Sequence, residues 1–166
     1  MSSQPRRKKR EAPGTGTGGF AHRNLPLLLL QARESVLARF RPILNAHGIT
    51  EQQWRIVRAM LEAGPLEPRQ IGKCCAISSP SLAGILARME ALGFITRERL
   101  AHDQRRVRVS LTTRSHTLAT RVAPEIEATY ALIEAQLGAD FTAGCYGALD
   151  EIIATLGKAR GQASEE

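Results

Sequence analysis

The chain has 166 residues and a formal charge of +7, and this length suits one domain with a full hydrophobic core. Residues 6–10 supply five positive charges and Glu11 removes one, so the rest of the chain is too weakly basic to identify nucleic acid as a partner by itself. The apolar run 25–30 is too short for a membrane span, and the three cysteines lack the spacing of a zinc site. We therefore expect a cytoplasmic protein with reduced thiols and no metal or cofactor.

The first part of the chain changes from a polar tail to a helix. Residues 1–22 hold the basic cluster and a Gly/Thr/Pro stretch, so a disordered basic tail is expected there. A helix is predicted from Asn24, which suits an N-cap, to about residue 48, with Pro42 as a kink or end. Its apolar face holds Leu29, Leu30, Val36, Leu37, Phe40, Ile43 and Leu44.

A second helix is predicted over residues 51–64. Thr50 and Gln53 have the spacing of a capping box at its start. Its buried side is expected to hold Trp54, Val57 and Leu61.

Two shorter helices, over residues 67–76 and 77–93, are separated only by a tight connection. The second is capped by Ser78 or Ser79 and ends at Gly93, a residue suited to the left-handed conformation. Its buried stripe is expected to be Leu82, Ile85, Leu86, Met89 and Leu92. Its opposite side consists of Pro80, Gly84, Ala87 and Ala91, flanked by Ser81 and Arg88. Because a solvated helix normally carries Lys and Glu, these small residues indicate close approach to another surface.

Residues 94–111 alternate apolar and polar side chains around a polar tip at residues 101–104, which predicts a two-stranded hairpin. Beyond Thr112 the chain is expected to be helical, with a bend at Pro124 and a break at Gly138. The apolar stripes of these last helices are Leu118, Val122, Ile126, Tyr130, Ile133 and Leu137, and then Phe141, Cys145, Leu149, Ile152 and Leu156. They exceed what one small domain can cover, so a twofold interface is favoured over an intramolecular three-helix cap.

Helix, tight turn, helix and hairpin are the order of a winged helix-turn-helix, whose second helix enters the major groove of DNA. Arg105 at the hairpin tip is placed to enter a minor groove, and Asp103 is placed to orient its guanidinium through a bidentate pair. Arg97, Arg99, Arg106 and Arg108 are expected to contact phosphates, unless the hairpin is solvated and its charges pair with each other. The predicted DNA-binding residues are Ser79, Ser81, Arg88, Arg97, Asp103, Arg105 and Arg106.

Three stretches carry a family resemblance: ITEQQW (49–54), SSPSLAGILARMEALGFITRE (78–98) and DQRRVRVSLT (103–112). Over residues 24–156 the chain resembles the MarR family of bacterial transcription regulators, and its front half is similar to the HpaR-like branch, which regulates the catabolism of homoprotocatechuate and related aromatic acids. Ser115 stands where the family usually has glycine. The resemblance implies a mainly α fold with a small two- to three-stranded antiparallel sheet. It also implies a homodimer that represses a pseudo-palindromic operator. The sequence has no pair of carboxylates, no Ser/His/Asp order and no phosphate-binding glycine loop, so no enzymatic activity is expected.

The expected domains are a winged helix-turn-helix over residues 49–112 and a helical dimerisation region formed by residues 23–48 and 113–158. The family resemblance further implies release from DNA by a small aromatic or N-heteroaromatic carboxylic acid. Alternatives of the same fold are a thiol redox sensor that uses Cys74 and Cys75, and an architectural DNA binder without sequence choice.

Arg33 is the first candidate for contacting such an effector, since it lies at the centre of the apolar stripe of the first helix. A buried guanidinium needs either a local carboxylate or a ligand carboxylate. Trp54 is a candidate for stacking on an aromatic ring, although a tryptophan in this position also suits the core. His22 and Asn24 are candidates for the rim of the site, although Asn24 also suits a helix cap.

Overall fold

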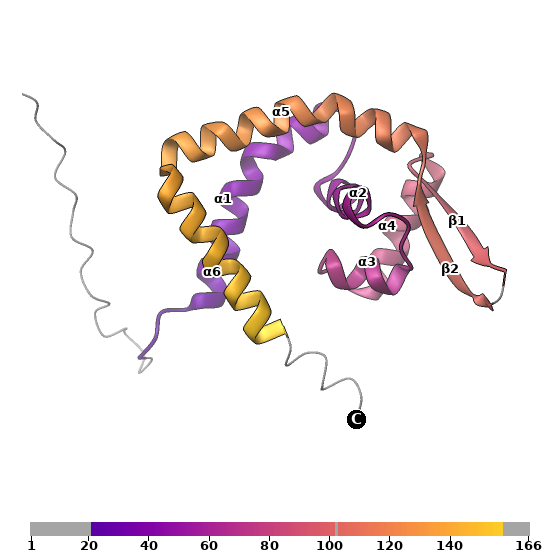
Figure 1. Ribbon diagram of the computed structural model, residues 1–166, viewed down its shortest axis with the longest axis horizontal. Helices are drawn as coiled ribbons and strands as arrows, with labels where there is room; N and C mark the ends of the chain where they lie inside the picture. Colours follow the sequence, from indigo (N-terminus) through magenta and orange to yellow (C-terminus); the bar gives the residue numbers. More distant parts are fainter. Residues whose placement is uncertain (1–20, 102, 158–166) are drawn as a thin grey trace, which may run out of the picture. The chain divides into compact units, whose positions relative to one another are not determined.

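The computed structural model describes residues 21–101 and 103–157, which form six helices and two strands (Figure 1). The chain divides into two units, residues 1–38 and 39–166, with the border inside helix α1 (Leu25–Ala46). The predicted basic tail lies outside the described residues except for Ala21 and His22. No described helix combines the length and the apolar character that a membrane crossing requires.

Helix α1 begins at the predicted cap. Asn24 Oδ1 accepts a hydrogen bond from the Leu27 backbone N–H at 3.0 Å, which satisfies one of the free donors of the first turn. Pro42 lies inside α1 and does not end it, because the helix continues to Ala46.

Helix α2 (Glu51–Ala63) has the predicted capping box, since Gln53 Oε1 accepts the Thr50 N–H at 2.9 Å and Thr50 Oγ1 accepts the Gln53 N–H at 3.3 Å. The predicted buried side is partly wrong. Val57 is buried, but Trp54 is only half-buried and Leu61 is exposed. The buried residues of α2 are Gln53, Ile56, Val57 and Met60.

Helices α3 (Pro68–Cys74) and α4 (Ser79–Ala91) form the predicted pair. Ser78 is the N-cap of α4, and Gly93 follows its end with φ +71°, as the sequence predicts. Four of the five predicted stripe residues are buried, whereas Leu92 is 44% exposed, so its assignment to the core was wrong.

Strands β1 (Ile95–Leu100) and β2 (Asp103–Leu111) pair antiparallel and form the wing. Val109, opposite Arg97, is fully buried. Leu66, in the connection between α2 and α3, forms a β-bridge with Val109 through backbone hydrogen bonds of 3.1 and 2.8 Å. This bridge adds the trace of a third strand, so the predicted two- to three-stranded sheet is confirmed.

Helix α5 (Thr113–Leu137) continues through Pro124, and the chain turns at Gly138 into α6 (Ala139–Gly157), as Figure 1 shows. One core holds the end of α1, α2, α3, α4, the base of the wing and the first half of α5 together. Its largest fully buried side chains are Leu44, Ile49, Ile56, Ile71, Leu86, Met89 and Ile95. Helix α6 contributes no buried residue to this core.

Candidate functional site

The outward side of α4 is exposed and smooth. Ser79, Ser81 and Arg88 are all exposed, which the predicted contact with DNA requires. A Cβ placed on Gly84 would stand 3.7 Å from Nη1 of Arg88, so the Arg88 side chain lies back over this glycine. Apart from the Arg88 guanidinium, the side chains on this face of α4 are therefore short. Such a face suits close approach of the helix to the bases of a DNA major groove.

The tip of the wing differs from the prediction in one contact. Arg105 is exposed, but Asp103 Oδ1 accepts a hydrogen bond from the Arg105 backbone N–H, at 3.0 Å, rather than from its guanidinium. Asp103 therefore fixes the backbone at the tip, and within the described residues the Arg105 side chain makes no ion pair. Such a short turn holds the arginine outward and leaves its charge available.

Two wing arginines that were predicted to contact phosphates are paired with carboxylates. Arg106 Nε donates to Glu67 Oε1 at 3.1 Å, and Arg97 Nε donates to Glu90 Oε2 at 2.8 Å. These hydrogen bonds lower the pKa of Glu67 and the pKa of Glu90 below the usual range. Both carboxylates lie outside the hairpin, so these two pairs differ from the alternative in which the charges of the hairpin pair with each other. Arg99 and Arg108 make no ion pair within the described part of the chain.

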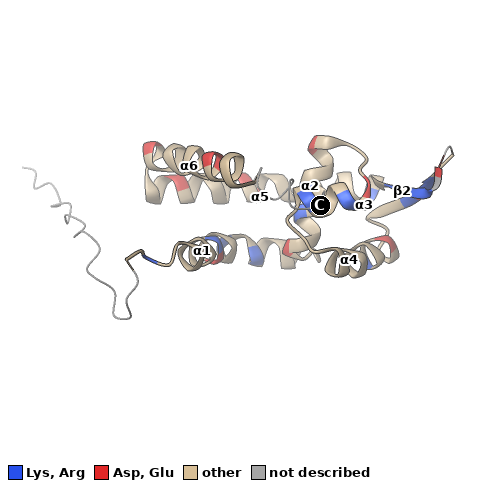
Figure 2. Cartoon of the chain, turned by 90° about the horizontal axis from the view of Figure 1, so that it is seen from below, with Lys and Arg blue, Asp and Glu red and all other residues tan. Residues whose placement is uncertain are grey.

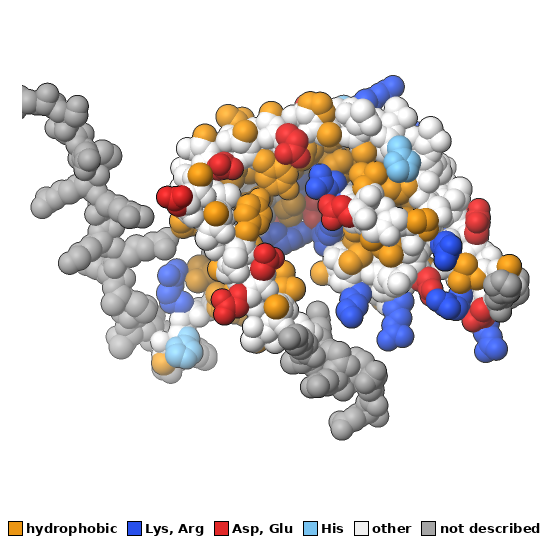
Figure 3. Space-filling model, viewed as in Figure 1, with side chains coloured by type: hydrophobic (Ala, Val, Ile, Leu, Met, Phe, Trp, Pro, Cys, Tyr) orange, Lys and Arg blue, Asp and Glu red, His pale blue; other side chains and the backbone are white. Residues whose placement is uncertain are grey.

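Positive side chains also lie beside the wing on α3. Arg69 and Lys73 are exposed. Figure 2 shows basic residues along β2 and on α3, and Figure 3 shows blue side chains projecting on this side of the molecule. Together with the wing they form a basic surface next to α4, which attracts a polyanion.

The predicted effector residues do not form one described site. Arg33 is exposed rather than buried and pairs with Glu34 at 2.9 Å, which is the local ion pair that the sequence allowed. Asn24 caps α1, and His22 is exposed. These three belong to residues 1–38 and Trp54 to residues 39–166, so a site that combines them stays a prediction.

A second group of residues, missed in the sequence, lies within the larger unit. The rings of Phe40 and Tyr130 have centroids 4.8 Å apart at 52°, a tilted geometry that favours aromatic contact. Burial and then the nearby Tyr146 raise the pKa of Tyr130, while the positive charge of Arg58 opposes this shift. Arg58 thus lies close to the phenol, and its guanidinium is shared with Glu62 at 3.4 Å.

The signal for this group was indirect. Arg58 appears in the sequence as an ordinary polar-face residue, and Tyr130 as one member of an apolar stripe. Only the folded arrangement of α1, α2 and α5 brings Arg58 near the Tyr130 phenol and places that ring against Phe40.

The cysteines favour the structural interpretation over the redox one. Burial raises the pKa of Cys75 to about 12, so its reactive thiolate is scarce at neutral pH. Cys74 is exposed and its Sγ lies 3.7 Å from that of Cys75. Within the described residues, no group of His, Cys, Asp and Glu is arranged to hold a metal.

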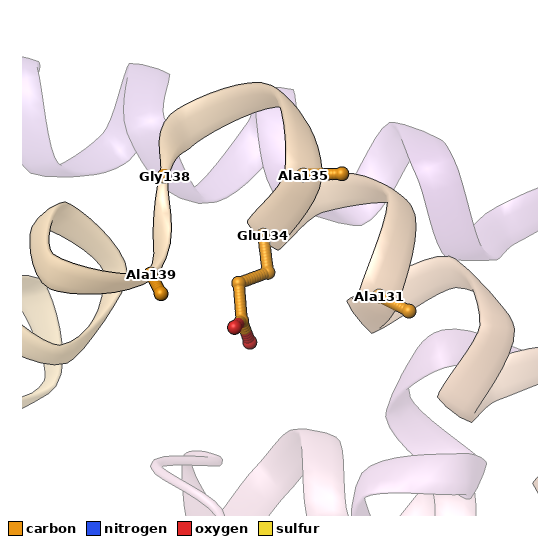
Figure 4. A pocket seen from close by; sticks show the side chains of 5 residues that line it. All are labelled: Ala131, Glu134, Ala135, Gly138 and Ala139. Carbon is orange, nitrogen blue, oxygen red and sulfur yellow. The ribbon is translucent and has the colours of Figure 1, made fainter.

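An open hollow of about 380 Å³ lies where α5 turns into α6 (Figure 4). It is lined by Ala131, Glu134, Ala135, Gly138 and Ala139. The carboxylate of Glu134 points into it and would repel an anionic ligand. The hollow therefore does not suit an aromatic acid.

Comparison with known proteins identifies the family. Residues 47–106 match the model of the MarR family. The homoprotocatechuate degradative operon repressor of Escherichia coli is 42% identical over 84% of this chain and 93% of its own length. The transcriptional regulator FarR of Neisseria gonorrhoeae is 41% identical over 70% of this chain and 80% of its own length.

A solved structure gives the same result in three dimensions. NadR in complex with 4-hydroxyphenylacetate has a TM-score of 0.71 and 36% identity, covering 85% of this chain and 97% of that one. These matches confirm the predicted winged helix-turn-helix and the prediction that the protein is not an enzyme. The chain belongs to the MarR family of transcription regulators.

Proposed function

We propose that the protein is a repressor that binds a pseudo-palindromic operator as a homodimer and is released by a small aromatic carboxylic acid. The observation that carries this proposal is that one core joins α4 and the wing, while α4 keeps one exposed face and the tip of the wing carries an exposed arginine. The name of the Escherichia coli relative supports repression, and the ligand of NadR supports an effector of the hydroxyphenylacetate type.

The proposed DNA contacts divide between two elements. Ser79, Ser81 and Arg88 on α4 would meet the major groove, where Arg reads guanine and Ser contacts bases or phosphates. Arg105 would enter the flanking minor groove, whose negative potential favours a guanidinium. Asp103 would act by fixing the backbone that carries Arg105.

The proposed dimer would cover the apolar surface of α5 and α6. Exposed apolar residues on these helices include Leu132, Leu137, Phe141, Tyr146, Ile153 and Leu156, and Figure 3 shows hydrophobic side chains along both. A monomer rarely exposes an apolar surface of this extent. A twofold pair of such helices would also place two copies of α4 on successive half-sites.

The proposed effector site is built on Arg58, Phe40 and Tyr130. A guanidinium pairs with a carboxylate, and the two rings offer an apolar wall to an aromatic ring. Trp54, which packs against the core from the same helix as Arg58, is a further candidate wall. Arg33 remains a competing candidate for the carboxylate contact, and the ligand class includes hydroxynicotinate-like acids.

Release would follow from a shift between dimer conformations. An acid that prefers one spacing of the two recognition helices stabilises that spacing, and repression ends where the spacing mismatches the DNA. A preference of about tenfold, roughly 1.4 kcal/mol, already changes operator occupancy.

The test uses a duplex that the wild-type protein enriches from a random library, with binding followed by fluorescence anisotropy. Addition of 4-hydroxyphenylacetate, hydroxybenzoates and hydroxynicotinates should release the duplex with at least one acid. Arg58→Gln should bind the duplex normally and resist release, whereas the control Arg121→Gln on α5 should respond normally. Normal release from Arg58→Gln together with resistance of Arg33→Ala would move the carboxylate contact to α1.

Two results would overturn the proposal as a whole. Equal affinity for the enriched and the unselected duplex would make the protein an architectural binder. Release by mild peroxide, abolished by substitution of Cys74 and Cys75 with serine, would make it a redox sensor.

A further inference from the structure

The contacts between the wing and the body of the protein include one backbone bridge and two ion pairs. The backbone of Val109 pairs with that of Leu66, Arg106 on β2 pairs with Glu67, and Arg97 on β1 pairs with Glu90. Glu67 directly precedes α3, and Glu90 lies in the last turn of α4. Each strand of the wing is therefore tied to a different helix of the helix-turn-helix.

The two ion pairs hold opposite faces of the hairpin. Arg97 is directly opposite Val109, and Glu98 is directly opposite Arg108. Because opposed residues share a face and neighbours alternate, Arg97 lies on the face of Val109 and Arg106 on the other. Because each face of the hairpin has one ion pair with the helix-turn-helix, the wing resists rotation relative to it in both directions.

The paired arginines are poorly suited to bind phosphate. In each pair the positive and negative charges nearly cancel. A paired arginine therefore releases few of the counterions bound to DNA and adds little to the binding free energy. Contact with phosphate would also require breaking hydrogen bonds that are charge-assisted. Arg105 and Arg108 are exposed on the same strand without such a partner in the described residues.

We propose that Glu67 and Glu90 are positioning residues for DNA recognition. They set the angle between the wing and α4 through Arg106 and Arg97, and these two arginines act through their carboxylates instead of as phosphate ligands. This inference rests on the proposed DNA-binding function and assigns specificity to two acidic residues near a polyanion.

The direction in which Glu67→Gln changes the affinity for DNA separates a positioning role from a purely electrostatic one. Glu67→Gln removes a negative charge near the DNA and frees Arg106, so electrostatics alone predicts tighter binding to every duplex. Loss of positioning predicts a different result: binding to the preferred duplex weakens while binding to unselected DNA does not. The ratio of the two affinities is therefore the quantity to measure.

The experiment compares the full-length wild type with Glu67→Gln, Glu90→Gln and the control Glu98→Gln, which removes an exposed charge of β1 that forms no ion pair within the described chain. The probes are the duplex enriched by the wild type and an unselected duplex of equal length at matched salt. The affinity ratio should fall by about threefold or more for the first two variants and stay unchanged for Glu98→Gln. A ratio unchanged in all three variants, or tighter binding of the enriched duplex by Glu67→Gln, would overturn the proposal.

The exchange variant Glu67→Arg/Arg106→Glu gives an independent test. It restores the ion pair with the charges reversed and keeps the net charge, so positioning predicts that it recovers most of the specificity lost in Arg106→Glu. Failure to recover, in a variant with wild-type circular dichroism and melting temperature, would show that Arg106 itself contacts phosphate and would overturn the proposal. If the wild type enriches no duplex at all, the proposed function fails instead.

Discussion

Ser115 Oγ donates a hydrogen bond to the carbonyl oxygen of Phe94, and this bond joins the first turn of α5 to the residue that precedes β1. Ser115 is fully buried. The same carbonyl accepts the Thr112 N–H at 3.1 Å, so the end of the wing and the start of α5 share one acceptor. The serine that departs from the family pattern therefore has a defined structural role.

Substitution of Ser115 should lower the free energy of unfolding. Ser115→Ala should cost about 1 kcal/mol, because the Phe94 carbonyl keeps its bond from Thr112. Ser115→Gly should cost roughly 1 kcal/mol more, since glycine is unfavourable in a helix. Urea unfolding followed by circular dichroism measures both values. Thr120→Ala, which removes an exposed hydroxyl from the same helix, is the control and should change stability by less than about 0.5 kcal/mol.

Arg105→Ala should weaken binding to the enriched duplex by about 1–3 kcal/mol and make the salt dependence shallower by about one counterion. The reason is that its exposed guanidinium has no competing carboxylate in the described structure. Anisotropy titrations at several salt concentrations give both numbers. Arg121→Ala removes the same charge from α5 instead of the wing, and an identical loss in that control would remove the wing tip from recognition.

The stability of the protein should fall at alkaline pH partly through Tyr130. Burial raises the pKa of Tyr130, so the folded state favours the neutral phenol. The stabilising contribution is complete below the pKa of an unfolded tyrosine, about 10, and is lost as the pH rises through the higher folded value. Tyr130→Phe should keep the ring contact with Phe40 and flatten this alkaline decline. Tyr146→Phe, which removes only the second cause of the raised pKa of Tyr130, should flatten it less. Urea midpoints measured across this pH range test the difference.

The two adjacent cysteines should differ in reactivity. Since burial raises the pKa of Cys75 to about 12 and Cys74 is exposed, an alkylating reagent at neutral pH should label Cys74 and spare Cys75 in the native protein. Peptide mapping by mass spectrometry measures each site, and unfolding in urea should abolish the difference. Rapid native labelling of Cys75 would contradict the buried assignment and revive the redox alternative.

Much of the fold could be predicted because local signals agreed with it. The capping box of Thr50 and Gln53, the left-handed Gly93 and the alternation that buries Val109 each specify a boundary or a face without reference to distant residues. The error in α2 has a local cause too. Gln53 is buried because its side chain caps the helix, and this turns the buried face away from Leu61.

The site was less predictable because its contacts join residues far apart in the chain. Glu67 and Arg106 are 39 positions apart, and no periodicity pairs them. Arg33 was expected at the centre of a buried stripe, but its neighbour Glu34 supplies a carboxylate in an exposed setting. Charge pairs of this kind depend on which side chains the completed fold brings within reach.

Helix α6 has no buried residue, so formation of the core does not depend on it. The core residues extend only from Phe40 to Ile126, so the ribosome has delivered everything the helix-turn-helix needs before α6 emerges. A nascent chain can therefore complete the core of the helix-turn-helix before α6 is available to fold. Substitutions in α6 would then leave the core of the helix-turn-helix unchanged.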